Sequence, residues 1–183
     1  MTAPTLAWPA AADEARLGLV TLVHRVQIDV PPAAVWRYVA DAAHWPAWQP
    51  DTRKVDPLPA GPQGVGSTIV QLAAVGDGSE PVTWQVLAAE PGRLWVAAAD
   101  TPRHWRRQVL ELQPLGTAAT RLTRTVSGCS RSPLARWADR WTLPRAWAGP
   151  AQDALAALKL KLEAVHAPPE VVPPPVPRWR AER

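Results

Sequence analysis

Apolar and polar residues alternate near the start of the chain and predict a strand. The apolar face holds four aliphatic residues, Leu22, Val26, Ile28 and Val30. His24 lies on the same face and interrupts it. Period-two alternation is typical of a strand with one buried face. Pro31 and Pro32 end the strand because proline cannot donate a backbone hydrogen bond, and Pro32 suits the first turn of a helix.

Directly after the two prolines, apolar residues recur at helical spacing. The apolar positions of this expected helix are Val35, Trp36, Val39 and Ala40. Asp41 then has the side chain to cap a second short helix that holds Trp45 and Trp48, although Pro46 limits its regularity. One segment therefore joins a strand to two short helices and brings three indoles to the same region.

Further alternating segments, separated by turn residues, predict an antiparallel sheet. The expected strands span 53–57, 67–75, 81–90, 93–99, 103–113 and 119–126. Glycine or proline marks the turns, at Gly76-Asp77-Gly78, Pro91-Gly92 and Gly116-Thr117. In the segment 81–90, one face carries Val82, Trp84, Val86 and Ala88.

A change of period after Ser132 predicts a long terminal helix. Ser132-Pro133 supplies a cap followed by proline at the first helical position. Leu134, Trp137 and Trp141 recur at three- and four-residue steps, and Pro144 is expected to kink or divide the helix. Beyond it, one stripe carries Trp147, Ala151, Leu155, Leu158, Leu162 and Val165.

This order of elements indicates an α+β protein in which an antiparallel sheet folds against one long helix. The domain is expected to span residues 19–166. Residues 1–18 are rich in Ala, Pro and Thr and predict a loosely docked arm. The proline-rich segment 167–183 predicts an extended or disordered tail.

Composition narrows the classes of function. The chain has eleven Trp, one Tyr and no Phe, so indoles must dominate the core, a pocket or both. Cys129 is the single cysteine, which excludes an internal disulfide and a zinc site of several thiolates. We expect no cofactor and no metal site.

No stretch resembles a signal peptide or a membrane span, so we expect a cytoplasmic protein. The pattern favours no particular oligomeric state.

Arginines account for most of the net charge of +4. Arg103, Arg106 and Arg107 surround Trp105, and basic residues interleaved with an aromatic can bind nucleic acid. A solvated sheet face, or one side of a ligand cavity, is the commoner role of such a cluster. We therefore do not expect a nucleic-acid partner.

The chain resembles the START-like, birch-pollen-allergen-like superfamily (SRPBCC), within it the bacterial polyketide cyclase/dehydrase and lipid-transport branch, over about residues 20–164. The resemblance rests on the order and spacing of several short motifs. They are Ile28-Asp29-Val30-Pro31-Pro32 leading to Val35-Trp36, Asp41 with Trp45 and Trp48, Gly66, Glu90-Pro91-Gly92 with Leu94, Gly116-Thr117 before Thr120-Arg121-Leu122-Thr123, and the helix from Leu155 to Leu162.

This resemblance implies a helix-grip fold, in which a curved antiparallel sheet of about six or seven strands wraps the long helix and leaves a cavity. Members of the superfamily usually hold an apolar ligand there, such as a lipid or aromatic polyketide, and a minority do chemistry on it. The motifs seen here specify fold and not catalysis.

Polar residues on otherwise apolar strand faces are the candidates for ligand contact. They are His24, His104, Arg106, Gln108 and Arg124. An unpaired polar group in a core costs roughly 1–3 kcal/mol, so inward-facing ones need partners or a wet cavity. A bulge or register slip that turns them to solvent is the alternative.

Indoles are the candidates for the apolar part of a cavity. These are Trp36, Trp84, Trp95 and Trp147, although core packing is the commoner role for any single one of them. Trp45 and Trp48 lie near the Pro/Gly segment 59–66, where they form either a cavity mouth or a buried cap.

Three functions fit this pattern. The first is binding or transport of a small hydrophobic ligand whose acidic or carbonyl group meets Arg106 or Arg124. The second is a cyclase or dehydratase in which His24 or His104, beside one of these arginines, moves a proton. The third is an interaction module that binds protein or RNA through the arginines or the proline-rich tail.

Overall fold

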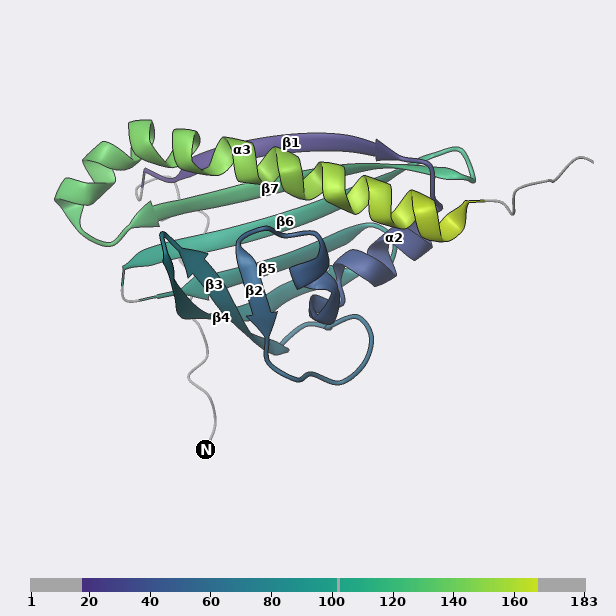
Figure 1. The fold of residues 1–183 in the computed structure, drawn as a ribbon, viewed down its shortest axis with the longest axis horizontal. Helices are drawn as coiled ribbons and strands as arrows, with labels where there is room; N and C mark the ends of the chain where they lie inside the picture. The colour runs from purple at the N-terminus through teal and green to yellow at the C-terminus, as the bar shows by residue number, and fades with distance from the viewer. Residues whose placement is uncertain (1–17, 102, 168–183) are drawn as a thin grey trace, which may run out of the picture.

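A computed structural model describes residues 18–101 and 103–167, so the expected arm and most of the tail lie outside the described residues. Seven antiparallel strands form one sheet in the order β1-β7-β6-β5-β4-β3-β2, with α3 lying across β1 and β7 (Figure 1). The elements are β1 (Val20–Ile28), α2 (Pro32–Val39), η1 (Ala42–Ala47), β2 (Thr52–Val55), β3 (Thr68–Val75), β4 (Gly78–Glu90), β5 (Leu94–Asp100), β6 (His104–Leu115), β7 (Ala119–Ser130) and α3 (Pro133–His166). The expected helix-grip arrangement is confirmed.

The segment from β1 to η1 folds as its sequence predicts. Exposed and shielded residues alternate along β1, and Pro31 precedes the first turn of α2. Asp41 caps η1 by accepting a hydrogen bond from the Ala43 backbone N–H at 3.0 Å. η1 is a 3₁₀-helix that contains Pro46, so the predicted irregularity is confirmed.

One expectation about β4 is wrong. Val82, Trp84 and Val86 face the core, but the pairing of β4 with β5 shifts register between Val86 and Ala88. A bulge adds one residue to one strand and reverses the alternation beyond it. Ala89, in place of Ala88, therefore packs against the core opposite Trp95.

α3 runs as one helix of 34 residues through both Pro144 and Pro150, so Pro144 does not divide it. In Figure 1 its first turns lie at an angle to the rest. Four residues of the predicted stripe are buried, namely Ala151, Leu155, Leu158 and Leu162. Val165 is 75% exposed, contrary to expectation. The helix has passed the end of β1 there, since Lys159 already reaches the Gln27 carbonyl.

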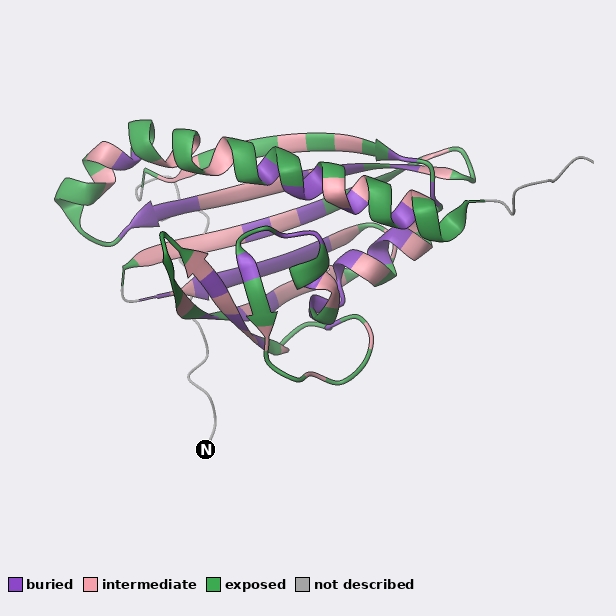
Figure 2. Cartoon of the chain, in the orientation of Figure 1, coloured by how far each residue is buried: buried purple, intermediate pink, exposed green. Residues whose placement is uncertain are grey.

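The core lies between the sheet, the second half of α3, and the α2–η1 segment, and the positions coloured as buried in Figure 2 follow this arrangement. Five indoles are buried in it, Trp36, Trp45, Trp48, Trp84 and Trp95. We call the sheet face that carries Leu110 and Leu122 of this core the inner face. Among the described residues, no helix is long and apolar enough to cross a membrane.

Candidate functional site

Polar side chains lie on the inner face of three neighbouring strands. His24 on β1 stands opposite Arg124 on β7, and Arg124 stands opposite Leu110 on β6. His104, Arg106 and Gln108 share a face with Leu110 because they alternate with it at two-residue steps. Both ladders of β7 pair without a register shift, so no bulge turns these residues to the outside.

Arg124 is the centre of one group of polar contacts. Its Nε and Nη2 donate to Gln108 Oε1 at 3.1 and 2.8 Å, and Nη2 also donates to Gln49 Oε1 at 3.1 Å. Its guanidinium lies 5.4 Å from the ring centroid of Trp48. We call His24, Trp48, Gln49, Gln108 and Arg124 the Arg124 cluster.

The charge of Arg124 is buried among neutral groups. Only 6% of the residue is exposed, and no carboxylate in the described part of the chain forms an ion pair with it. Burial lowers the pKa of Arg124, and the more distant charge of Asp51 acts against this shift. An arginine nevertheless stays protonated, so the cluster holds a cation without an adjacent counter-ion.

Three nitrogens around this cation lack a hydrogen-bond partner among the residues that the structure describes; two are donors, and the third is an imidazole nitrogen that donates or accepts according to its tautomer. They are His24 Nε2, Trp48 Nε1 and Gln49 Nε2, all of them buried. A buried donor left unsatisfied costs about 1–3 kcal/mol. The cluster is thus arranged to donate to an acceptor that the described chain does not supply, either an ordered water or a group of a bound molecule.

A second polar group lies further along the inner face. Arg106 Nη2 lies 3.8 Å from Glu80 Oε1, and the buried Asp139 of α3 accepts from the Ser130 N–H at 2.6 Å and its hydroxyl at 2.9 Å. His104 stands opposite Ser130. Burial lowers the pKa of His104 and the charge of Arg106 lowers it further, while Glu80 and Asp139 act in the opposite direction. His104 is therefore a neutral imidazole near pH 7.

His24 and His104 do not meet. Their cross-strand partners Arg124 and Ser130 are six residues apart on β7, which corresponds to about 20 Å along an extended strand. A general acid or base must lie within hydrogen-bond reach of the atom it serves. The two histidines therefore belong to separate sites, His24 beside Arg124 and His104 beside Arg106.

Most candidate indoles are already engaged by the protein. Their indole N–H groups donate hydrogen bonds within the protein. Trp36 donates to the Leu94 carbonyl at 3.3 Å, Trp84 donates to Gln71 Oε1 at 2.7 Å, and Trp95 donates to the Gln63 carbonyl at 3.0 Å. Trp45 meets the rings of Trp84 and Trp95 edge to face. Within this set Trp48 differs, because its buried N–H points to no described acceptor.

The ring of Trp147 packs against the inner face of the sheet at Gly128, where there is no side chain. A Cβ at Gly128 would lie 2.8 Å from Trp147 Cη2 and 2.7 Å from the Trp105 carbonyl oxygen, so no larger residue fits without displacing the ring. Gly128 stands opposite Arg106. Trp147 is half-buried and lies over the sheet beside the second polar group.

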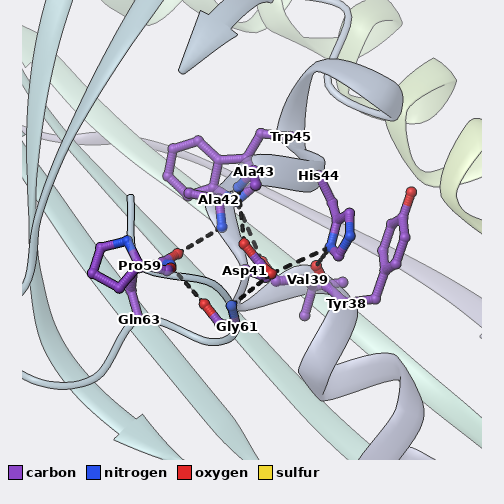
Figure 3. Close-up of polar contacts among 10 residues, drawn as sticks. All are labelled: Tyr38, Val39, Asp41, Ala42, Ala43, His44, Trp45, Pro59, Gly61 and Gln63. Carbon is purple, nitrogen blue, oxygen red and sulfur yellow. Dashed lines mark hydrogen bonds and ion pairs between the residues drawn. The ribbon is translucent and has the colours of Figure 1, made fainter. Parts of the chain in front are cut away.

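A network of hydrogen bonds around Asp41 joins the start of η1, which carries Trp45, to the Pro/Gly loop (Figure 3). Asp41 Oδ2 accepts from the Gly61 N–H at 3.1 Å, and Gln63 Oε1 accepts from the Ala42 N–H at 2.6 Å. The ring of His44 stacks on Tyr38 at 4.2 Å between centroids. The Pro/Gly loop is thereby tied to η1, and Trp45 and Trp48 are both buried, at 1% and 2% exposed. This burial matches the cap alternative and not an exposed mouth.

Gln49, Glu80 and Asp139 were missed by the sequence reasoning. Gln49 has a weak signal, since it directly follows Trp48 at the end of a predicted short helix. Glu80 has one as well, since it precedes Val82 by two residues and so shares the core face of β4, whereas Asp139 has none because it approaches the inner face only after α3 has packed. Cys129 is buried and its pKa is raised by burial, so it is a poor nucleophile.

The predicted basic cluster is divided between the two faces of the sheet. Arg106 faces inward, whereas Trp105 lies on the outer side. Trp105 is covered by Arg131 and Arg136, at 4.8 and 5.8 Å from its ring centroid. Arg106 therefore does not share a surface with Trp105, and its inward position corresponds to one side of the sheet's inner face.

A pocket of about 270 Å³ lies elsewhere, on the outer face. It is lined by Arg93, Leu94, Glu111, Leu112, Gln113 and Thr123. Glu111 and Thr123 alternate with the core residues Leu110 and Leu122, so the sheet separates this pocket from Arg124. The orphaned donors, and not this depression, mark the better candidate site.

Comparison with known proteins agrees with the fold. A family model described as polyketide cyclase / dehydrase and lipid transport matches residues 20–163. No curated protein matches the chain. Solved structures do, all at low sequence identity.

Three of these structures illustrate the range. The ZhuI aromatase/cyclase from Streptomyces sp. R1128 shares 19% identity over 81% of this chain and 97% of its own, with a TM-score of 0.67. A START superfamily protein from Mycobacterium smegmatis shares 16% over 79% and 98%, with a TM-score of 0.63. Norcoclaurine synthase from Thalictrum flavum shares 12% over 81% and 97%, with a TM-score of 0.62. At these identities the likeness is one of fold.

Proposed function

This chain belongs to the polyketide cyclase / dehydrase and lipid transport family, and we propose that it binds a small hydrophobic ligand against the inner face of its sheet. The ligand carries at least one oxygen acceptor, such as a carbonyl, phenol or carboxylate, which meets the Arg124 cluster. The observation that carries the proposal is the set of three buried nitrogens without described partners around a buried cation.

Such a ligand would satisfy the site in two ways. Its oxygen would accept from Trp48 Nε1 or Gln49 Nε2, removing the desolvation cost of those donors, and His24 Nε2 would share a hydrogen bond with the same group. A partial or full negative charge on it would also offset the buried charge of Arg124, which Gln108 and Gln49 only solvate. The apolar body of the ligand would lie among the aliphatic and indole side chains of the same face.

The test compares two conservative variants. Trp48→Phe removes an N–H that lacks a described partner and keeps an aromatic ring, whereas Trp84→Phe removes one that donates to Gln71. With oleate and a hydroxylated anthraquinone as probes, calorimetry should show about tenfold weaker binding in Trp48→Phe and unchanged affinity in Trp84→Phe.

Native mass spectrometry of protein purified from its own source supplies the second readout. A co-purifying apolar molecule with an oxygen function supports the proposal. Repeated absence of such a molecule, together with no binding of either probe, would reject it.

A second function, cyclisation or dehydration of the bound molecule, is favoured by His24 standing directly opposite Arg124. His24 would remove a proton from a carbon between two carbonyls, while Arg124 holds the enolate oxygen. That carbon would then form a bond to a further carbonyl carbon of the same ligand. The resulting alkoxide would take the proton from His24 before water is lost.

This second function predicts a contrast between the two histidines. Turnover of a poly-β-ketone analogue should fall at least about a hundredfold in His24→Gln and change little in His104→Gln. Turnover that survives in His24→Gln would remove the proposed base, while ligand binding could still hold.

A further inference from the structure

The first half of α3 exposes large apolar side chains. Leu134 is 86% exposed, Trp137 64% and Trp141 43%. The two indoles contact each other at 4.7 Å between ring centroids, with an interplanar angle of 72°. They lie at helical spacing on turns that precede the buried stripe, so packing against the sheet does not explain them (Figure 2).

Arginines accompany these side chains. Arg140 lies 3.8 Å from the ring centroid of Trp141 and 5.0 Å from that of Trp137, and Arg145 is exposed one turn beyond. We call Leu134, Trp137, Arg140, Trp141 and Arg145 the Trp137 face.

The charge of this region is of one sign. Arg136, Arg140 and Arg145 lie between positions 132 and 152, where Asp139 is the one acidic residue, whereas Arg131 just before them forms an ion pair with Asp100. Asp139 is buried and accepts two hydrogen bonds from Ser130, so it does not neutralise the surface. The exposed side of these turns is therefore cationic and apolar together.

We propose that the Trp137 face docks on an anionic lipid surface. Indoles prefer the boundary between headgroups and acyl chains, where the ring is sheltered and the N–H remains hydrated. Leucine beside them adds apolar area, and arginines that extend from the same turns meet anionic headgroups. An RNA partner would use the arginines and indoles but would leave Leu134 exposed.

This proposal is independent of ligand binding at the Arg124 cluster. Docking uses residues on the exposed side of α3, whereas the cluster lies on β1, β6, β7 and the segment after η1. Loss of one activity should therefore leave the other measurable in the same protein preparation.

The experiment is flotation of the full chain with vesicles of phosphatidylcholine alone or mixed with phosphatidylglycerol. We expect binding to the mixed vesicles that weakens with added salt. Trp137→Ser combined with Trp141→Ser should abolish it. Arg140→Gln and Arg145→Gln should each weaken it about fivefold, since each removes from the protein one positive charge that would lie against the anionic headgroups.

Leu160→Ser is the matched control. Leu160 is also exposed on α3, at 70%, but lies on the second half of the helix. This variant should bind the mixed vesicles as the unaltered chain does. Lipids with brominated acyl chains should quench the tryptophan emission of the unaltered protein. This quenching should be absent when Trp137 and Trp141 are both replaced by serine.

Several results would overturn the proposal. Absence of vesicle binding, or binding that persists when both indoles are replaced, would do so directly. Self-association that depends on Trp137 and Trp141 and is unaffected by lipid would assign the face to a second copy. Indole emission that is already sheltered without vesicles and unchanged by them would assign it to another segment of this chain.

Discussion

The two halves of the inner face handle their polar atoms in opposite ways. On β4 and β5, Trp84 and Trp95 bury their rings and give each N–H to an oxygen of a neighbouring strand or loop. On β1 and β7, His24 and Arg124 are shielded by the same sheet but leave donors and a charge without a complementary group in the described chain. On β4 and β5 the protein satisfies these polar groups itself. On β1 and β7 they need an acceptor from a water or a bound molecule.

Burial alone therefore does not locate function in this molecule. Trp95 and Trp48 are nearly equally buried, at 0% and 2% exposed. Their N–H groups separate them, since that of Trp95 reaches Gln63 O and that of Trp48 reaches no described acceptor. Hydrogen-bond satisfaction is the property that distinguishes packing from a candidate site.

The largest change in the free energy of unfolding is expected on β5, where the indole N–H is satisfied within the protein. Trp95→Ala removes a fully buried ring, its edge-to-face contact with Trp45 and its bond to Gln63. The free energy of unfolding in urea should fall by about 3–5 kcal/mol. Trp137→Ala, on the exposed turns of α3, should change it by no more than about 0.5 kcal/mol. Equal losses would contradict the assignment of Trp95 to the core.

A smaller effect is expected at Arg124. Arg124→Met leaves the side-chain oxygens of Gln108 and Gln49 without their donor and should cost about 1–3 kcal/mol of unfolding free energy. Replacing Gln108 as well, in Gln108→Met with Arg124→Met, should recover part of that loss because both partners are then apolar. Ligand binding should be lost in both variants. A double variant less stable than the single one would show that the Arg124–Gln108 contact is not the source of the cost.

The smallest effect concerns His104. Its pKa is lowered in the folded protein, so below its ordinary value of 6.5 the unfolded chain binds the proton more readily. The free energy of unfolding should therefore fall as the pH drops below about 6.5, by less than about 1 kcal/mol because the ring is partly exposed. In His104→Gln this part of the pH dependence should vanish, whereas His166→Gln should retain it. A slope unchanged in His104→Gln would exclude His104 as its cause.

Local features of the chain were predictable from sequence. Alternation in β1, proline at the start of α2, the Asp41 cap and the glycine turns each depend on neighbouring residues. The polar inner face was also predictable, because His24 and Arg124 occupy positions that the strand period assigns to the core.

Features that depend on contacts between distant elements were not predictable. The bulge after Val86 sets which alanine meets Trp95, and no residue in β4 signals it. The separation of His24 from His104 follows from the register of two ladders on β7. Gln49 joins Arg124 across 75 residues of sequence, so only the folded chain brings them together.

The ladder between β1 and β7 has a kinetic consequence. Strands β3 to β7 pair with their neighbours in sequence, but Thr21 meets Ser127 across 106 residues. Closing so long a loop costs more chain entropy than forming a hairpin, and contacts of this range slow folding. β1 is therefore expected to join the sheet after the hairpins have formed. His24 would then reach Arg124 only at that last step, so the candidate site would mature later than the indole core beside it.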